Sequence, residues 1–434
     1  MQTHFTLAQL QDDPGIAEAN QILRSCVHCG FCLSACPTYT LLGDERDSPR
    51  GRIYLIKSML ESGTKPERDV TVHFDRCLSC LSCMSACPSG VDYMHLIDGA
   101  RTRVEREIKR PMLERTQRAL LSWLLPRPAL FRLALMAAQP ARPFARLVPG
   151  RLGAMLRLAS APAPPSPLDK PQVFPAKSAM QKRVALLTGC VQKVVAPAIN
   201  EATVRLLTRL GCEVEIVDGL GCCGALDHHM GRAEAAHDHA ARAVKAIMAA
   251  HRARALDAVV VNASGCGTAL KDYGHLFKHE PALAADAATV ASLARDVSEL
   301  VRDLNLRPTR ALGHHRIAYH SACSLQHGQK ITELPKQLLV QAGFVVVDVP
   351  EGHLCCGSAG TYNLMQPALA SQLGERKAAN IARVAPAMVA AGNVGCLVQI
   401  KGFSAVPVVH TVELLDWATG GPAPASIAQT VLAD

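Results

Sequence analysis

The chain has 434 residues, 17 cysteines and a formal net charge of +9, and 49% of its residues are apolar while only 4% are aromatic. This length suggests two to four domains, and the composition favours helices and α/β packing over a β-sandwich. The first residues lack the basic and apolar stretches of a secretory signal, and no run of 18 apolar residues predicts a membrane-spanning helix. We therefore expect a cytoplasmic protein whose thiols serve metals or redox chemistry rather than a disulfide framework.

Two cysteine runs near the start share the spacing Cys-x2-Cys-x2-Cys-x3-Cys-Pro. They consist of Cys26, Cys29, Cys32 and Cys36, and of Cys77, Cys80, Cys83 and Cys87. In this spacing three cysteines of one run bind a [4Fe–4S] cluster, and the fourth binds the neighbouring cluster. The prediction is that cluster 1 is bound by Cys26, Cys29, Cys32 and Cys87, and cluster 2 by Cys77, Cys80, Cys83 and Cys36. A zinc site or a disulfide framework has no use for two compact runs that both end in Cys-Pro.

The segment between the two runs has helical periodicity over residues 51–60. Small bacterial ferredoxins place their two runs closer together on a β-rich scaffold. This arrangement is more similar to the helical ferredoxin module of succinate dehydrogenase iron–sulfur subunits. We predict that residues 1–100 form a helical ferredoxin domain with two [4Fe–4S] clusters.

Residues 101–180 form a basic helical segment followed by a Pro-rich linker at 161–176. No acidic residue lies between Glu114 and Asp169, and leucine, alanine, phenylalanine and tryptophan alternate with eight arginines: Arg115, Arg118, Arg127, Arg132, Arg142, Arg146, Arg151 and Arg157. The pattern predicts short basic amphipathic helices. They could lie on an anionic membrane surface, dock on an acidic partner, or form a connector whose arginines are simply solvated. Nothing else in the chain resembles a nucleic-acid reader, so we expect no nucleic acid partner.

From residue 181 onward, strand and helix patterns alternate, and a cysteine pattern occurs twice. The strand-like segments are 184–188, 214–218, 258–262, 317–320, 345–349 and 388–391. The cysteines that follow them are Cys190, Cys222, Cys223 and Cys266, and then, 130 to 133 residues later, Cys323, Cys355, Cys356 and Cys396. We predict two repeated parallel α/β units, at 181–310 and 311–434. Because loops after parallel strands emerge at one edge of a sheet, each set of four thiols should converge there on a metal site.

Other motifs carry weaker signals. The segment Gly219–Gly224 matches the dinucleotide-binding fingerprint, but the second repeat keeps only its Cys-Cys-Gly, so we interpret the extra glycines as incidental. His320 and His327 flank Cys323 and are candidate hydrogen-bond donors to that site. Cys212 has no repeat partner and is expected to be a buried small hydrophobe. No nucleophile–base or carboxylate pair stands out, so we predict no catalytic residue.

Together these motifs resemble one family, the iron–sulfur subunits of bacterial glycolate oxidase (glycolate dehydrogenase). The resemblance rests on both cysteine runs, both Cys-Cys-Gly repeats, and the segments 48–53 (SPRGRI), 188–192 (TGCVQ), 262–267 (NASGCG) and 355–363 (CCGSAGTYN). It implies a complex in which two flavoprotein-like subunits, which carry the FAD, oxidise glycolate to glyoxylate. This subunit would pass the electrons to a quinone or another respiratory acceptor, in the cytoplasm or peripherally on the inner face of the inner membrane. The alternatives are the iron–sulfur subunit of anaerobic glycerol-3-phosphate dehydrogenase, or that of a heterodisulfide-reductase-like or lactate-oxidising complex.

The resemblance leaves the Cys-Cys-Gly sites open. In heterodisulfide reductases such sites carry non-cubane iron–sulfur clusters, and the motif ends with two cysteines, whereas here each repeat ends with one, Cys266 or Cys396. A conventional cluster, zinc or free thiols are the remaining possibilities. Two further hypotheses are a thiol–disulfide reductase that uses the vicinal cysteines, and a scaffold whose clusters are only structural.

Overall fold

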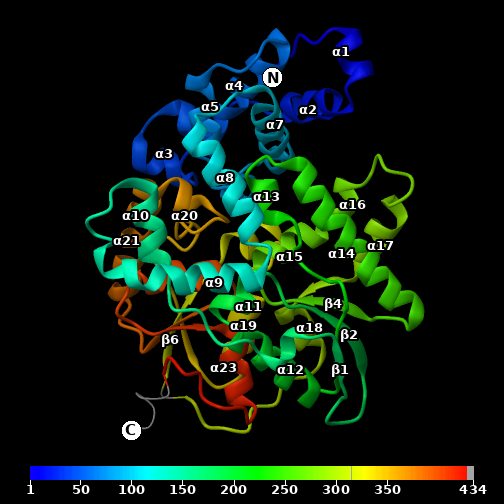
Figure 1. Ribbon diagram of the computed structural model, residues 1–434, viewed down its shortest axis with the longest axis vertical. Coiled ribbons are helices and arrows are strands. Elements are labelled where there is room, and N and C mark those ends of the chain that lie inside the picture. Colours follow the sequence, from blue (N-terminus) through cyan, green and yellow to red (C-terminus); the bar gives the residue numbers. More distant parts are fainter. Residues whose placement is uncertain (314, 428–434) are drawn as a thin grey trace.

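The N-terminal part of the chain is a helical module. The computed structural model describes residues 1–313 and 315–427, and its first helices are α1 (Leu7–Asp12), α2 (Pro14–Ser25), α3 (Pro37–Leu42), η1 (Glu45–Asp47), α4 (Pro49–Ser62), α5 (Arg68–Asp75), α6 (Ser82–Ser85) and α7 (Tyr93–Glu107) (Figure 1). The starts of α2, α4 and α7 are capped by Asp13, Ser48 and Asp92, whose side chains accept hydrogen bonds from backbone amides of the first turn. These helices pack around a small apolar core that includes Leu23 and Ile56, both completely buried. The predicted helical ferredoxin fold is confirmed.

The arginine-rich region forms an arm of helices that links this module to the rest of the chain: α8 (Met112–Leu124), α9 (Pro128–Ala138), η2 (Gln139–Phe144) and α10 (Gly150–Leu158). Arg118 donates to the carbonyl of Met230, Arg132 donates to that of Lys193 at 3.0 Å, and Arg151 donates to that of Met365 at 2.8 Å. The hypothesis that all of these arginines are simply solvated is therefore wrong for these three. In the part of the chain that the structure covers, no helix has both the length and the apolar character needed to span a bilayer.

The first α/β unit has a five-stranded sheet in the order β1-β3-β2-β4-β5. Its strands are β1 (Gln172–Phe174), β2 (Lys182–Leu187), β3 (Cys212–Ile216), β4 (Ala258–Val261) and β5 (Ala294–Asp296). All neighbours are parallel except β1, which runs antiparallel to β3. Because β1 lies inside the predicted Pro-rich spacer, the prediction of an unstructured linker is wrong there: its backbone pairs with the sheet edge. The helices are α11 (Gln192–Val195), α12 (Ala198–Arg209), α13 (Ala225–His229), α14 (Ala233–Ala253), α15 (Ser264–Lys271), α16 (Tyr273–Leu276), α17 (Ala284–Leu293) and α18 (Val297–Asp303).

The second unit repeats this plan with four parallel strands in the order β7-β6-β8-β9. The strands are β6 (Arg316–His320), β7 (Val345–Asp348), β8 (Met388–Ala391) and β9 (Val408–His410). The helices are η4 (Ser324–Gly328), α19 (Leu334–Gln341), α20 (Tyr362–Met365), α21 (Pro367–Arg383), α22 (Val394–Lys401) and α23 (Thr411–Ala418). The predicted α/β class is confirmed, while residues 428–434 of the predicted unit lie outside the described residues.

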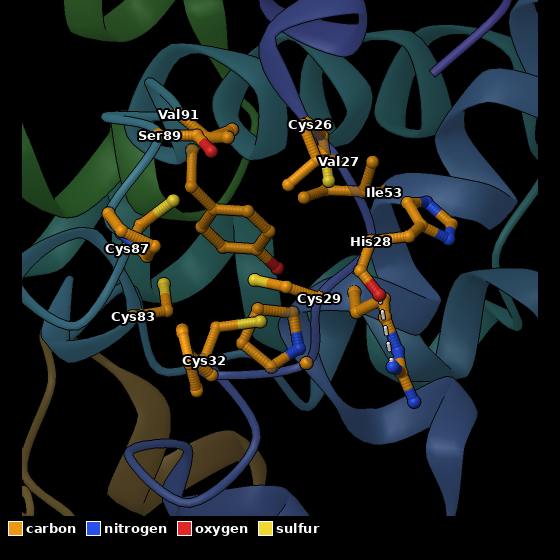
Figure 2. A pocket seen from close by; sticks show the side chains of 16 residues that line it. Cys26, Val27, His28, Cys29, Cys32, Ile53, Cys83, Cys87, Ser89 and Val91 are labelled. Carbon is orange, nitrogen blue, oxygen red and sulfur yellow. Dashed lines mark hydrogen bonds between the residues drawn. The ribbon is translucent and has the colours of Figure 1, made fainter.

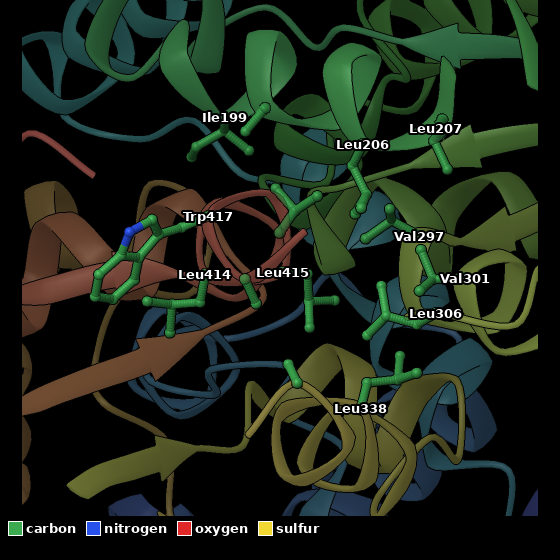
Figure 3. Packing of buried hydrophobic residues seen from close by; sticks show 14 of the residues in the cluster. Ile199, Leu206, Leu207, Val297, Val301, Leu306, Leu338, Leu414, Leu415 and Trp417 are labelled. Carbon is green, nitrogen blue, oxygen red and sulfur yellow. The ribbon is translucent and has the colours of Figure 1, made fainter. Parts of the chain in front are cut away.

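The two sheets face each other across one apolar layer. Helices α12, α18, α19 and α23 fill the space between them, and Leu206, Leu338 and Trp417 lie in this shared core (Figure 3). At the edge where the strands end, the imidazole of His410 contacts the Asn262 carbonyl at 2.8 Å, and the hydroxyls of Ser264 and Ser324 are 2.6 Å apart. The carboxyl end of β4 in the first sheet therefore meets the carboxyl ends of β6 and β9 in the second. The loops that carry the cysteines leave the sheets on the side that faces the ferredoxin module.

Candidate functional site

Both ferredoxin runs fold into the same tight loop. The residue before the second cysteine has a left-handed backbone in each run, with φ of 58° at His28 and 50° at Ser79, and so does the residue after it, with φ of 87° at Gly30 and 62° at Leu81. Three of these four residues are not glycine, and such conformations cost about 1–3 kcal/mol each and persist where the surroundings enforce them. The shared geometry brings the first three cysteines of each run to the same cavity.

The first cavity lies between the two runs. Figure 2 shows the side chains around it, with sulfur atoms from both runs facing the same space. Five cysteines line it: Cys26, Cys29, Cys32 and Cys87, which are assigned to cluster 1, and Cys83. The structure thus brings Cys87 to the first run, as the crosswise prediction requires.

The second cavity is lined by Cys36, Cys77, Cys80 and Cys83, which are the four cysteines assigned to cluster 2. Cys83 lines both cavities, so they share a wall. Burial raises the pKa of the Cys80 and Cys83 thiols well above the usual range and that of Cys32 to about 11. A bound metal displaces the protons of such thiols and supplies the positive charge that burial otherwise denies to the thiolates. The donor set and its surroundings fit a thiolate-bound cluster.

Arg52 is a functional candidate that the sequence patterns did not single out, although it lies within the segment SPRGRI. Its guanidinium is 1% exposed and lies 3.8 Å from the Cys36 sulfur. It donates to the His73 carbonyl at 2.7 Å and pairs with the fully buried Asp47 at 3.3 Å. Burial opposes its charge, but Tyr93, Cys77, Cys36 and Asp47 outweigh it and raise the pKa of Arg52 above its ordinary value. A permanent positive charge therefore faces the second cavity.

In the first Cys-Cys-Gly site, the cysteines of three loops converge. The sulfur atoms of Cys190 and Cys222 are 3.7 Å apart, and the Cys223 thiol contacts Cys266. Hydrogen bonding from Cys190, and then from Cys223, lowers the pKa of Cys222 below its usual range. Gly224 is required because a Cβ there would lie 2.6 Å from the carbonyl oxygen of Ala236.

The second Cys-Cys-Gly site has the same arrangement. The sulfur atoms of Cys323 and Cys355 are 3.7 Å apart, and Cys356 contacts Cys396. Hydrogen bonding from Cys356, helped by His320, lowers the pKa of Cys396 to about 6 despite its burial. The expectation that every repeat cysteine lies in a loop is wrong for Cys266 and Cys396, which lie in the first turns of α15 and α22.

The second site lies directly against the second ferredoxin cavity. Cys80 and Cys355 belong to one buried apolar cluster with Leu78 and Tyr362, and Cys323 packs against it. Next to this cluster the Ser85 hydroxyl bonds to the His327 imidazole at 2.8 Å, and the other imidazole nitrogen lies 3.2 Å from the His353 carbonyl. His327 thus bonds to Ser85 of the ferredoxin module and to the backbone, and among the described residues it makes no hydrogen bond to a cysteine. The first site has different neighbours, because Cys223 and Cys266 pack into the outer core of their own sheet.

Comparisons with known proteins agree with this organisation. Residues 25–91 match the 4Fe-4S dicluster domain family, and residues 184–271 and 317–401 each match the cysteine-rich (CCG) domain family. The chain is 40% identical over 418 residues to the glycolate oxidase iron–sulfur subunit of Escherichia coli (strain K12), covering 96% of this chain and 99% of the relative. It is 32% identical over 444 residues to the probable glycolate oxidase iron–sulfur subunit of Bacillus subtilis (strain 168), covering 97% and 99%. Lactate utilization protein A of Geobacillus kaustophilus (strain HTA426) is 27% identical over 241 residues, covering 54% of this chain and 98% of the relative.

Proposed function

Since the chain belongs to the family of glycolate oxidase iron–sulfur subunits, we propose that it is the electron-transfer subunit of a flavin-dependent glycolate dehydrogenase. Two flavoprotein-like partner subunits, which carry the FAD, oxidise glycolate to glyoxylate. This chain receives the electrons and delivers them to a quinone or another respiratory acceptor, and it contributes no catalytic residue. The observation that carries the proposal is the pair of cysteine-lined cavities that share Cys83.

The eight cysteines of the two runs hold two [4Fe–4S] clusters in the crosswise arrangement. A bound cluster of this type supplies a centre that accepts and releases one electron. The chain's own residues provide the rest: buried side chains such as Leu78, Leu81 and Tyr93 line the second cavity, and Arg52 directs positive charge at it. The apolar cluster around Cys80 and Cys355 connects that cavity to the second Cys-Cys-Gly site. The chain therefore presents a row of three adjacent thiol sites along which electrons can pass.

The Cys-Cys-Gly sites complete the proposal as metal sites. Four convergent thiols in each unit suit a metal that prefers sulfur, so iron or zinc are the candidates. The depressed pKa values of Cys222, Cys355 and Cys396 favour the thiolate form that such a metal requires.

The full chain, purified without oxygen, tests this assignment. We expect iron and acid-labile sulfide for at least two clusters, and we expect Cys36→Ser to remove the electron paramagnetic resonance (EPR) signal of the Cys77–Cys83 cluster while Cys87→Ser removes that of the Cys26–Cys32 cluster. Cys212→Ala is the matched control, because Cys212 is completely buried in β3 among apolar side chains, away from every cavity. Protein that binds zinc alone and no acid-labile sulfide would contradict the proposal.

The arm of α8 to α10 gives the proposed location. Nine large apolar side chains of this arm are exposed among the described residues: Met112, Leu113, Leu120, Trp123, Leu133, Met136, Phe144, Leu147 and Leu152. Exposed arginines accompany them, namely Arg115, Arg127, Arg142, Arg146 and Arg157. Apolar and cationic side chains on short helices suit an anionic lipid surface. We propose that this arm binds peripherally to the cytoplasmic face of the membrane, which contains the quinone acceptor.

A further inference from the structure

The two Cys-Cys-Gly sites differ at one position of the sheet. In the first unit Leu187 ends β2 and pairs with Val261 of β4, and in the second unit His320 ends β6 and pairs with Ala391 of β8. The two residues occupy equivalent places in equivalent strand pairs, three residues before Cys190 and Cys323 respectively. The duplicated fold thus has an isobutyl group at one site and an imidazole at the other.

The imidazole of His320 is buried and makes no hydrogen bond of ordinary length and angle. The residue is 1% exposed, neither ring nitrogen has such a bond among the described residues, and the Cys396 thiol is the neighbouring polar group that acts on it. A buried polar group without a well-formed hydrogen bond is destabilising, so such a group in a folded protein points to an interaction that the protein atoms alone do not supply. Ligation of a metal would satisfy one of these nitrogens.

The imidazole of His320 also lies close enough to the cysteines of the second site to share a metal ion with them. Ligand atoms of His320, Cys356 and Cys396 are all within 4.8 Å of one another, and all three residues are buried. Cys323 and Cys355 complete the site, with their sulfur atoms 3.7 Å apart. Of the three such groups among the described residues, this one alone contains cysteine. Sulfur and imidazole nitrogen together form a donor set for iron or zinc.

Besides His320, a buried lysine distinguishes the two sites. Lys377 of α21 is 2% exposed and donates to the Glu351 carbonyl at 3.0 Å. Burial lowers its pKa, while the negative charge of Cys356, Cys355 and Cys396 acts in the opposite direction. The equivalent helix of the first unit is α14. The carbonyls of Ala236 in α14 and Ala370 in α21 lie close to Gly224 and Gly357 respectively, and with these two residues aligned, Ala243 is the first-unit equivalent of Lys377. A buried lysine therefore faces the second site and suits a centre that carries net negative charge, whereas the basic groups that act on the first site, Lys193 at Cys190 and His239 at Cys222, are only half-buried.

We propose that His320 is a ligand of an iron-containing centre in the second Cys-Cys-Gly site, which is thereby held by sulfur and nitrogen, whereas the first site offers sulfur alone. Replacement of thiolate by imidazole in iron–sulfur centres raises the reduction potential. The second site would therefore attract electrons from the neighbouring ferredoxin cavity more strongly than an all-cysteine site does. This inference rests on the proposed electron-transfer function and defines where in this chain the electrons collect.

Substitutions at His320 in the full chain, purified anaerobically, test the ligand role. We expect His320→Leu, which copies the first site, to lose the iron of one centre and keep the iron bound by the ferredoxin cysteines. We expect His320→Cys to keep that iron and to shift the midpoint potential of one centre to lower values. His327→Gln is the matched control, because His327 bonds to Ser85 and the His353 backbone, and it should retain both the iron and the potential.

A spectroscopic measurement remains decisive even if His320→Leu fails to fold. Pulsed EPR of reduced protein labelled with ¹⁵N-histidine should show a nitrogen coupling that disappears in His320→Cys and persists in His327→Gln. Full iron content in His320→Leu, zinc in place of iron at the second site, or an unchanged nitrogen signal in His320→Cys would each overturn the proposal. The function proposed above fails separately, because it requires iron and acid-labile sulfide at the eight ferredoxin cysteines whatever the second Cys-Cys-Gly site contains.

Discussion

The two Cys-Cys-Gly units share a fold but differ in what surrounds their thiols. In both, parallel strands deliver four cysteines to one sheet edge, with the same pair of sulfur atoms 3.7 Å apart. The first site is lined by its own unit's apolar core, whereas the second lies against Cys80 of the ferredoxin module and carries a buried histidine and lysine. Repetition of the fold reproduces the thiols, and the neighbours of each copy decide what those thiols can do.

The two units are also joined to the ferredoxin module by different forces. The second joint is mainly apolar, built around Leu78, Cys80 and Cys355, with a hydrogen bond between Ser85 and His327 beside it. The first joint is polar: His95 of α7 bonds to Asp272 at 3.0 Å and stacks on His275, which itself pairs with Glu18. A dry joint keeps two thiol sites close without intervening water, and a polar joint fixes orientation. The difference matches a second unit that exchanges electrons with the ferredoxin module and a first unit that is held in place.

The largest expected effect comes from replacing one cysteine of each Cys-Cys-Gly site in turn. Cys355→Ser should lower electron flow from the flavoprotein partners to the acceptor by at least roughly 100-fold, beyond the roughly 10–100-fold typical of losing a supporting group around a metal. The matched Cys222→Ser should lower it by less than about tenfold, because the first site has no contact with a ferredoxin cysteine. Steady-state reduction of a quinone analogue by the assembled complex measures both variants. Equal losses would remove the functional distinction between the units.

Arg52→Gln tests the charge beside the second cavity. Losing a charged hydrogen bond to the Cys36 sulfur, worth about 1.5 kcal/mol, should lower the potential of the Cys36–Cys83 cluster by about 60 mV. Because Asp47 stays buried with one cation fewer, the free energy of unfolding should also fall by about 3 kcal/mol. Redox titration followed by EPR measures the first effect and thermal unfolding the second. Arg52→Lys keeps the positive charge and should recover most of the potential, and a potential unchanged in Arg52→Gln would show that this charge does not act on the cluster.

The arm contacts both units, so lipid binding tests which face of the molecule meets the membrane. Arg142→Gln with Arg146→Gln should weaken binding to vesicles that contain anionic lipid by about 2 kcal/mol, or roughly 30-fold, at about 1 kcal/mol per arginine. Binding should also weaken as salt is added. Arg307→Gln with Arg310→Gln, an exposed pair outside the arm, is the control and should bind like the wild type. Vesicle binding that is absent or independent of salt would instead indicate a protein partner for the arm.

The smallest expected effect concerns pH and the polar joint. Burial opposes the charge of His95, but hydrogen bonds to Asp272 and Asp92 outweigh it and raise the pKa of His95 from 6.5 to about 10. The stabilisation is therefore complete below about pH 6.5 and disappears as the pH rises through 10. His95→Gln should lower the free energy of unfolding by about 1 kcal/mol at pH 6.5, a value reduced for partial exposure, and by almost nothing above pH 10. A difference that grows with pH in chemical denaturation of the cluster-loaded protein would contradict this assignment.

Much of the fold could be predicted because its signals are local. The strand-like segments 184–188 and 388–391 became β2 and β8 with shifts of at most two residues, since a run of apolar, β-branched residues favours a buried parallel strand wherever it lies. The edge strands β1, β5 and β9 and the helical positions of Cys266 and Cys396 were missed, because three-residue strands and first turns are stabilised by their neighbours rather than by their own sequence. The hypothesis of fully solvated arginines was wrong for Arg118, Arg132 and Arg151, whose partners lie up to 214 residues away.

The sequence by itself determined the chemistry of this chain: cysteine spacing specifies how many thiols can surround one centre, and the repeat shows that a second kind of thiol site was duplicated. Only the tertiary structure decided which sites are neighbours. Cys80 and Cys355 are far apart along the chain, and their contact depends on how the helical module packs on the second sheet. The same holds for His320, which spacing marked only as a flanking histidine and which burial places among Cys356 and Cys396 without any other partner. Ligand type follows from local spacing, whereas distance and burial, which govern electron transfer, follow from long-range packing.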